Sequence, residues 1–301
     1  MNLVVSGIVE CPIDVQTYAP EQGGFGAFRC FHPRCLAGIV DAIWDFDIPD
    51  SDAAKTLTIK HAPGTSLLLM AQYRAPVMVH HCDRELPTKC AIQIQARAVT
   101  LRPTGALGLI IACLRPDAAS RIVDAPLTDF ADAAIHLGNL FGAGETSTCD
   151  DMLAGARNSP ERIATVESFL LRRLRPQLDG TIYRAALHLR KNPTVPIQHL
   201  ASKLGLSARH LSRRFNAAFG IGPKQFARLA RFEKVMAERR NGLSWAQVAC
   251  ACGLTDQAHL VKEFKSMVGE LPTEFFAEER RMAAGQMSEA NFVVRHTRGE
   301  D

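Results

Sequence analysis

Long apolar runs are missing from this chain of 301 residues. A membrane-spanning helix needs about 18 or more consecutive apolar residues, and no such stretch occurs. The segment from Met1 to Cys11 also lacks the basic start of a secretory signal and carries a glutamate inside its short apolar run. We therefore expect no membrane association and a cytoplasmic location.

Sequence signatures of the common enzyme classes are absent as well. The chain contains no G-x-S-x-G, no phosphate-binding P-loop, no G-x-G-x-x-G and no H-E-x-x-H. Neighbouring carboxylates such as Asp150 and Asp151 lie in a context typical of a solvated surface. We predict no catalytic residues, no cofactor and no enzymatic activity.

The cysteines do not form a disulfide framework. Their number, nine, is odd and their spacing is irregular, which favours reduced thiols. Cys30, His32 and Cys35, together with the run His80-His81-Cys82, raise the question of a metal or redox site. Their spacing matches no standard zinc pattern. We predict no metal site and keep a thiol or metal sensor as an alternative.

Positive charge is concentrated in the C-terminal part of the chain. Residues 181–301 contain 19 Lys and Arg against 11 Asp and Glu, whereas residues 1–180 contain 16 against 20. A basic end joined to a mildly acidic one indicates that the C-terminal part binds a polyanion.

The N-terminal part has the pattern of short strands. Leu57 and Ile59 alternate with polar residues, and so do Ile92, Ile94 and Ala96. Gly or Pro residues separate these segments. Short strands separated by turn residues predict a barrel or sandwich.

Helices follow this β-rich region. Ser159-Pro160-Glu161 predicts a helix start with Ser159 as its N-cap. A further helix is expected over about 181–191, and the prolines within 192–196 break the chain after it. We therefore predict a β-rich sensor or dimerisation domain with C-terminal helices over 1–180, a helix and linker over 181–196, a DNA-binding domain over 197–280 and a flexible tail over 281–301.

One residue pattern occurs twice in the last third of the chain. Its first copy comprises Leu200, Ala201, Gly205, Leu206, Ser207, Leu211, Phe215, Gly220, Pro223 and Phe226. Its second copy comprises Val248, Ala249, Gly253, Leu254, Thr255, Leu260, Phe264, Gly269, Pro272 and Phe275. The spacings agree, except for one additional residue after the Thr of the second copy. Two copies of one pattern with matching spacings are much harder to produce by chance than a single copy.

Each element of the pattern has a mechanical reason in a helix-turn-helix unit. Gly205 can adopt the left-handed conformation that ends the first helix. Ser207 is positioned to cap the next helix, and Leu211 and Phe215 bury that helix on the first. In the second copy Gly253 makes the turn and Thr255 or Asp256 provides the cap. A helix from Pro223 to about Arg240 is expected to connect the units, so that two reading helices could enter successive major grooves about 34 Å apart.

These residues resemble a known family. The segment from about Pro196 to Phe276 looks like the DNA-binding domain of AraC/XylS transcriptional regulators, most specifically over 253–260. The N-terminal part resembles more loosely the β-barrel sensor domains of such regulators. The resemblance implies an α+β fold, with an N-terminal cupin-like barrel domain with helices and a C-terminal all-α domain of two helix-turn-helix units joined by a connecting helix.

The resemblance also implies a set of DNA-binding residues. Base-reading positions fall on Arg209, Ser212 and Arg213 in the first unit and on Gln257, Ala258, His259 and Lys262 in the second. His210, Arg214 and Lys265 complete the basic or polar faces of these helices. Ala258 and Val261 stand where relatives often carry polar residues, and Phe276 replaces a frequent basic residue. We expect the first unit to read more bases than the second.

The sequence therefore predicts a sequence-specific transcriptional regulator, an activator by family, with double-stranded DNA and RNA polymerase as partners. A small-molecule effector at the N-terminal domain and a homodimer are further expectations, and no ligand-binding residue is assigned.

A second hypothesis is a DNA-repair alkyl-transfer enzyme that carries the same DNA-binding module. It needs a reactive cysteine with basic neighbours, and Cys35, next to Arg34 and near His32, is its candidate. A third is an N-terminal domain that only dimerises.

Overall fold

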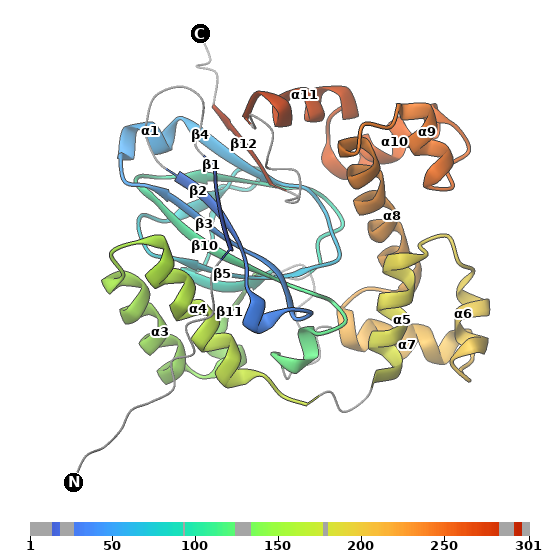
Figure 1. Cartoon of the computed structure of the whole chain (residues 1–301), viewed down its shortest axis with the longest axis horizontal. Helices are drawn as coiled ribbons and strands as arrows, with labels where there is room; N and C mark the ends of the chain where they lie inside the picture. Colours follow the sequence, from blue (N-terminus) through green and yellow to red (C-terminus); the bar gives the residue numbers. More distant parts are fainter. Residues whose placement is uncertain are drawn as a thin grey trace.

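The computed structural model describes residues 14–18, 27–92, 94–123, 134–176, 180–282 and 292–296. Two β-sheets lie at its centre, a pair of helices covers one side of them, and a helical body lies on the other side (Figure 1). The strands of the first sheet are Asp14–Tyr18 (β1), Ala27–His32 (β2), Val40–Ile48 (β3), Leu67–Gln72 (β5), Lys89–Ile92 (β8), Leu107–Leu114 (β10) and Ala134–His136 (β11). Those of the second are Leu57–His61 (β4), Val77–Val79 (β6), Arg84–Glu85 (β7), Val99–Pro103 (β9) and Phe292–His296 (β12).

All described strand pairs are antiparallel. The first sheet has the order β1-β2-β3-β10-β5-β8-β11, and the second has the order β12-β4-β9-β6-β7. The strand expected across Ile92 to Ala96 ends at Ile92. Ile94 packs instead into the core of the helical body, which explains its apolar character without a strand.

Central strands of the first sheet are buried on both faces. On β10, Leu109 and Ile111 face the second sheet, where Trp44 and Phe46 of β3 pack beside them. The alternate residues, such as Ile110 and Ala112, belong to another core that includes apolar residues of the covering helices. This explains why β10 reads as a continuous apolar run rather than an alternating one.

The covering helices are Ala143–Gly155 (α3) and Ser159–Arg173 (α4), preceded by the short helix Leu137–Phe141 (α2). The side chain of Asn158, not of Ser159, caps α4, because it accepts the N–H of Glu161. The prediction of Ser159 as the N-cap is therefore wrong by one residue. Ser159 is buried and its hydroxyl donates to Asp45 on β3.

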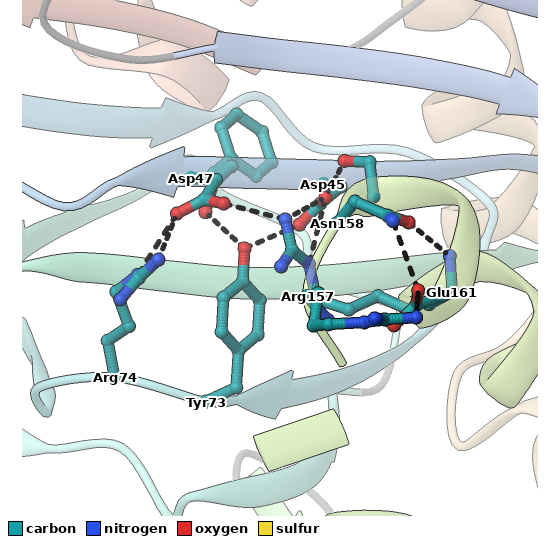
Figure 2. A network of polar contacts seen from close by, with 10 residues as sticks. Asp45, Asp47, Tyr73, Arg74, Arg157, Asn158 and Glu161 are labelled. Atoms are coloured by element: carbon teal, nitrogen blue, oxygen red, sulfur yellow. Dashed lines mark hydrogen bonds and ion pairs between the residues drawn. The ribbon is translucent and has the colours of Figure 1, made fainter. Parts of the chain in front are cut away.

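A buried polar network fastens α4 to β3 (Figure 2). Arg162 is buried and donates to Asp45 at 3.0 Å and to Asp47 at 2.6 Å. The Tyr73 hydroxyl donates to Asp45 at 2.6 Å. Burial and the adjacent Asp45 carboxylate raise the pKa of Tyr73. Arg74 closes the network by an ion pair of 2.8 Å with Asp47.

The helical body is formed by the last third of the chain. Its helices are Gly180–Lys191 (α5), Ile197–Lys203 (α6), Ala208–Phe219 (α7), Pro223–Arg240 (α8), Trp245–Ala251 (α9), Gln257–Val268 (α10) and Pro272–Met282 (α11). The remaining short elements are Ser51–Lys55 (α1) and the 3-10 turns Arg34–Leu36 and Ala119–Arg121. Helix α8 has the predicted bounds, and one continuous core joins the two repeat copies.

Two segments near the expected domain boundaries pack against other parts of the molecule. Helix α5 lies in the segment predicted as a helix and linker over 181–196, and its residues Ile182, Ala185 and Leu189 are buried in the core of the helical body. Within the expected flexible tail, residues 292–296 form β12, which pairs with β4 of the sheet domain. The edge of the sheet supplies the hydrogen-bonding partners that this tail segment needs to be ordered.

The α+β class and the arrangement of a β-domain followed by a double helix-turn-helix region are confirmed. Among the described residues, no helix combines the length and the apolar character that a membrane crossing requires.

Candidate nucleic-acid interface

The first helix-turn-helix unit consists of α6, the turn around Gly205, and α7. Gly205 has a φ of +67°, the left-handed conformation predicted for the turn. The N–H of Leu206 donates to the carbonyl of Ala201 at 2.9 Å and closes the turn. The Ser207 hydroxyl accepts the N–H of His210 at 3.2 Å, so Ser207 is the predicted N-cap.

Helix α7 buries one face and presents the other to solvent. Leu211, Phe215 and Phe219 are buried in the core. Arg209, His210 and Arg213 are exposed, and Ser212 and Arg214 are half-buried. The five residues predicted for this unit therefore lie outside the core of the domain.

A groove runs beside the N-terminal half of α7. It has a volume of about 730 Å³, and Arg209 and Ser212 of α7 line it. Its other basic residues are Lys224, Arg228 and Arg231 of α8. Sequence reasoning assigned no role to these three cations. Their spacing of four and three residues, which places them on one helix face, was the signal that could have found them.

The second unit consists of α9, the turn around Gly253, and α10. Asp256 caps α10, since its carboxylate accepts the N–H of His259 at 2.7 Å. Gly253 has a φ of +67°, and a Cβ at this position would lie 2.7 Å from the methyl carbon of Thr194. Only glycine fits, because both the backbone conformation and the close approach of Thr194 disfavour a side chain.

The outer face of α10 carries the residues predicted for this unit. Gln257, Ala258, His259, Lys262 and Lys265 are all exposed. Val261 is half-buried, so its apolar side chain contributes to packing. Phe276 is buried and its ring lies 5.5 Å from that of Trp245, which explains an aromatic residue at this position.

Helix α8 joins the two units rigidly. It runs from the α7 end of the helical body to the α10 end (Figure 1). Glu263 of α10 accepts from Arg228 at 2.9 Å and from Arg231 at 3.0 Å. Arg228 also donates to the Ser266 hydroxyl at 2.8 Å. These contacts attach α10 to the connecting helix α8.

A cavity of about 540 Å³ lies between the sheets and the helical body. Trp44, Leu68 and Phe292 give it apolar walls, while Arg190 and Lys234 line its polar side. These residues come from three strands and from α5 and α8, so sequence reasoning could not assemble them.

Several titratable groups of this cavity have shifted pKa values, among them His61 and Glu233. The His61 ring packs against that of Phe292 in a tilted arrangement with 4.5 Å between ring centroids, and burial lowers the pKa of His61 to about 4. Burial raises the pKa of Glu233, although Arg190 and hydrogen bonds from Thr65 oppose this effect. The cavity thus combines apolar side chains of the strands with charged groups, most of which lie on α5 and α8.

The cysteine and histidine residues singled out in the sequence are not assembled into a metal site within the described residues. Cys30 is buried, with its sulfur 3.8 Å from His32 Nε2. Cys35 and Cys82 are exposed.

Comparison with known proteins agrees with the geometry of the C-terminal part. Residues 200–278 match a family model described as a helix-turn-helix domain, of the AraC type. No curated protein has a matching sequence.

Solved structures give weaker likenesses. ToxT from Vibrio cholerae O395 is similar at 11% identity, with 76% of this chain and 94% of that chain covered and a TM-score of 0.45. ToxT from strain SCE256, described as bound to an unsaturated fatty acid, has 10% identity, coverage of 77% and 93%, and a TM-score of 0.42. The AraC-like transcriptional activator CuxR has 12% identity, coverage of 73% and 85%, and a TM-score of 0.31. We draw no conclusion about function from similarities this distant.

The fold and the matched domain define the class of this protein as a DNA-binding transcription regulator. Its C-terminal region is an AraC-type helix-turn-helix domain, as the duplicated motif predicted.

Proposed function

We propose that this protein binds a specific DNA sequence through both helix-turn-helix units and regulates transcription in response to an effector. The observation that carries the proposal is the pair of solvent-facing helices α7 and α10, attached to one connecting helix by a shared core. A major-groove reader needs such an exposed polar face opposite a buried one. The protein acts in the cytoplasm, beside its DNA, and has no enzymatic role.

The two units have different roles in this proposal. Arg209, Ser212 and Arg213 read bases from α7, with Arg213 as the direct contact, because Arg pairs in a bidentate way with guanine. Gln257, Ala258, His259 and Lys262 face the bases from α10, where fewer side chains offer specific hydrogen bonds. Phosphate contacts come from the remaining basic or polar residues of the two faces, His210, Arg214 and Lys265.

The basic groove extends the surface offered to DNA. Lys224, Arg228 and Arg231 line it together with Arg209. Since phosphate contacts position a protein without specifying sequence, we assign these α8 cations to the DNA backbone next to the first unit. Glu263 neutralises part of this charge through Arg228 and Arg231.

The effector site of this proposal is the cavity between the sheets and the helical body. Its volume of about 540 Å³ falls in the range of small-molecule sites, about 300–1,000 Å³. Trp44 and Phe292 suit an apolar body, and Arg190 and Lys234 suit a polar end. An occupant would touch both the sheet domain and α8.

We include RNA polymerase and a second copy of the chain as partners. Support for a second copy comes from Met152 of α3 and Leu171 of α4, which are 47% and 42% exposed. A contiguous exposed apolar patch marks a contact surface, and we assign these two residues to such a patch.

The test is selection of duplexes from a random-sequence pool by the full chain, followed by footprinting of the selected duplex. We expect a protected site of about two helical turns per monomer and an affinity that falls steeply with salt. A pool that shows no enrichment, with binding that depends on salt alone, would contradict sequence-specific regulation. The effector part is tested separately by a thermal-shift screen of small molecules, in which a Trp44→Ala variant should lose the shift.

A further inference from the structure

The chain returns to the sheet domain after the DNA-binding domain. Strand β12 pairs antiparallel with β4 along its whole length, from Phe292 opposite His61 to His296 opposite Leu57. It forms the edge of the five-stranded sheet. The helical body is therefore attached to the sheets at both of its ends, through α5 and through β12.

The side chains of β12 alternate between two cores. Phe292 and Val294 are buried in the core between the two sheets. Val293, which points to the opposite face as strand geometry requires, is buried in the core of the helical body. Three consecutive residues thus join the two halves of the molecule by apolar contact.

Charged groups strengthen the same junction. Arg295 of β12 and Lys60 of β4 both donate to Glu270, each at 2.8 Å. Glu270 lies in the turn between α10 and α11, directly after the second reading helix. The N–H of Ala98 donates to the carbonyl of Met267, in the last turn of α10, at 2.8 Å. The C-terminal end of α10 is consequently held by the sheet domain.

The strand also closes the interdomain cavity. Phe292 is one of its walls and packs against Trp44, with 6.1 Å between the ring centroids. Cys113 of β10 lies in the same cavity, and its burial raises the pKa of the thiol. If β12 left β4, the cavity would lose an aromatic wall and Glu270 would lose one of its two cations.

We propose that β12 is a strap that fastens the second helix-turn-helix unit to the sheets and closes the interdomain cavity, and that its release from β4 frees both. Its regulatory meaning rests on the proposed function: a cavity occupant that displaces Phe292 would loosen the second DNA-reading unit. Arg295 of β12 bonds Glu270, directly after the C-terminal end of α10, so the strap acts on the attachment of the second unit and not on the exposed face of α10.

The test uses a chain that ends after residue 290 and, as its matched control, a chain that ends after residue 296. Backbone hydrogen exchange at Ala98 and Thr65 reports the two interdomain hydrogen bonds, and exchange at Ile111 of β10 reports the sheet core. We expect exchange at Ala98 and Thr65 to be at least about tenfold faster without the strap and unchanged at Ile111, because local opening exposes only the amides that it frees. Alkylation of Cys113 by N-ethylmaleimide should also accelerate, whereas that of Cys90, buried in the sheet core, should not.

A full-length variant shows whether the effect of truncation comes from a general folding defect. Val293→Thr with Arg295→Gln weakens the contacts to the helical body but keeps Phe292 and Val294 in the sheet core. We expect faster exchange at Ala98 with unchanged alkylation of Cys113. The proposal would be contradicted if the chain without β12 and its control had equal exchange rates at Ala98 and Thr65 and equal alkylation rates at Cys113. It would also be contradicted if exchange at Ile111 and alkylation of Cys90 accelerated as much as these three readouts. No readout uses DNA, so a failure of sequence-specific binding would be seen separately.

Discussion

Glu233, near the middle of α8, accepts the backbone N–H of Thr65 at 2.7 Å. The Thr65 hydroxyl donates to the same carboxylate, and Arg190 of α5 lies 3.9 Å from it. Arg190 in turn forms an ion pair of 2.7 Å with Asp41 of β3. The helix that joins the two DNA-reading units is therefore bonded directly to a loop of the sheet domain.

Glu233→Ala should destabilise the protein by about 1–3 kcal/mol, since it leaves the buried N–H of Thr65 without an acceptor. Thr65 is fully buried in the folded protein. Urea unfolding measures the change, and Glu238→Ala on the same helix is the matched control. Equal midpoints for the two variants would show that the contact contributes nothing to stability.

Arg162→Met should be among the most damaging substitutions in the sheet domain. It leaves the fully buried carboxylate of Asp45 without its cation, and loss of one partner of a buried ion pair costs about 3–5 kcal/mol. The expected readout is a lower midpoint in urea. Arg157→Met provides the control, because that side chain is 86% exposed. A small effect of Arg162→Met would mean that Ser159 and Tyr73 are sufficient to satisfy Asp45.

Arg213→Ala should weaken binding of the selected duplex by about 1–3 kcal/mol and relax base preference at one position. Lys265→Ala should weaken all sequences alike and lower the slope of log affinity against log salt by about one. Titration of labelled duplexes that differ at single positions separates the two effects. Asn216→Ala, one turn beyond on α7, serves as the control. If Arg213→Ala changes neither affinity nor base preference, the assigned base contact is wrong.

Glu270 makes the junction at β12 sensitive to acid. Burial disfavours its ionised form, but hydrogen bonds from Arg295 and Lys60 outweigh burial and hold its pKa below the usual value of 4.5. Because this pKa is lower in the folded state, the ion pairs contribute fully to the stability of the fold above pH 4.5. Their contribution is lost as the pH falls from 4.5 through the pKa of Glu270 in the folded state. Stability should therefore fall less in Glu270→Gln than in the parent chain between neutral pH and pH values below 4.5.

Urea unfolding at a series of pH values measures this difference, with Glu238→Gln as the control. Parallel pH curves for the parent chain and Glu270→Gln would contradict an ionic contribution of Glu270.

The DNA-binding domain could be predicted because its signals are local. Ser207, Gly205 and Gly253 act within a few residues of their own turns, and the structure has each in its predicted place. The bounds of α8 followed in the same way from Pro223 and the helical spacing after it. The roles of the exposed residues on α7 and α10 stay predictions.

Other features have no local signal. Asp45 and Arg162 are far apart in the sequence, and their meeting depends on which face of β3 is covered by α4. The N-cap at Asn158 differed from the prediction because Ser159 finds its partner across the chain in Asp45. The sequence around residues 292–296 contains no turn or cap that predicts a strand. This segment forms a strand because it pairs with the edge strand β4.

The sequence by itself determined that the last third of this chain forms two capped helix-turn-helix units, since spacing, caps and turn glycines act over short distances. Tertiary structure alone decided that α5 belongs to their core, that a cavity lies between the sheets and helices α5 and α8, and that β12 fastens the second unit in place. Those outcomes depend on contacts between residues far apart in the chain, and such contacts are set by the packing of whole sheets and helices rather than by any local pattern.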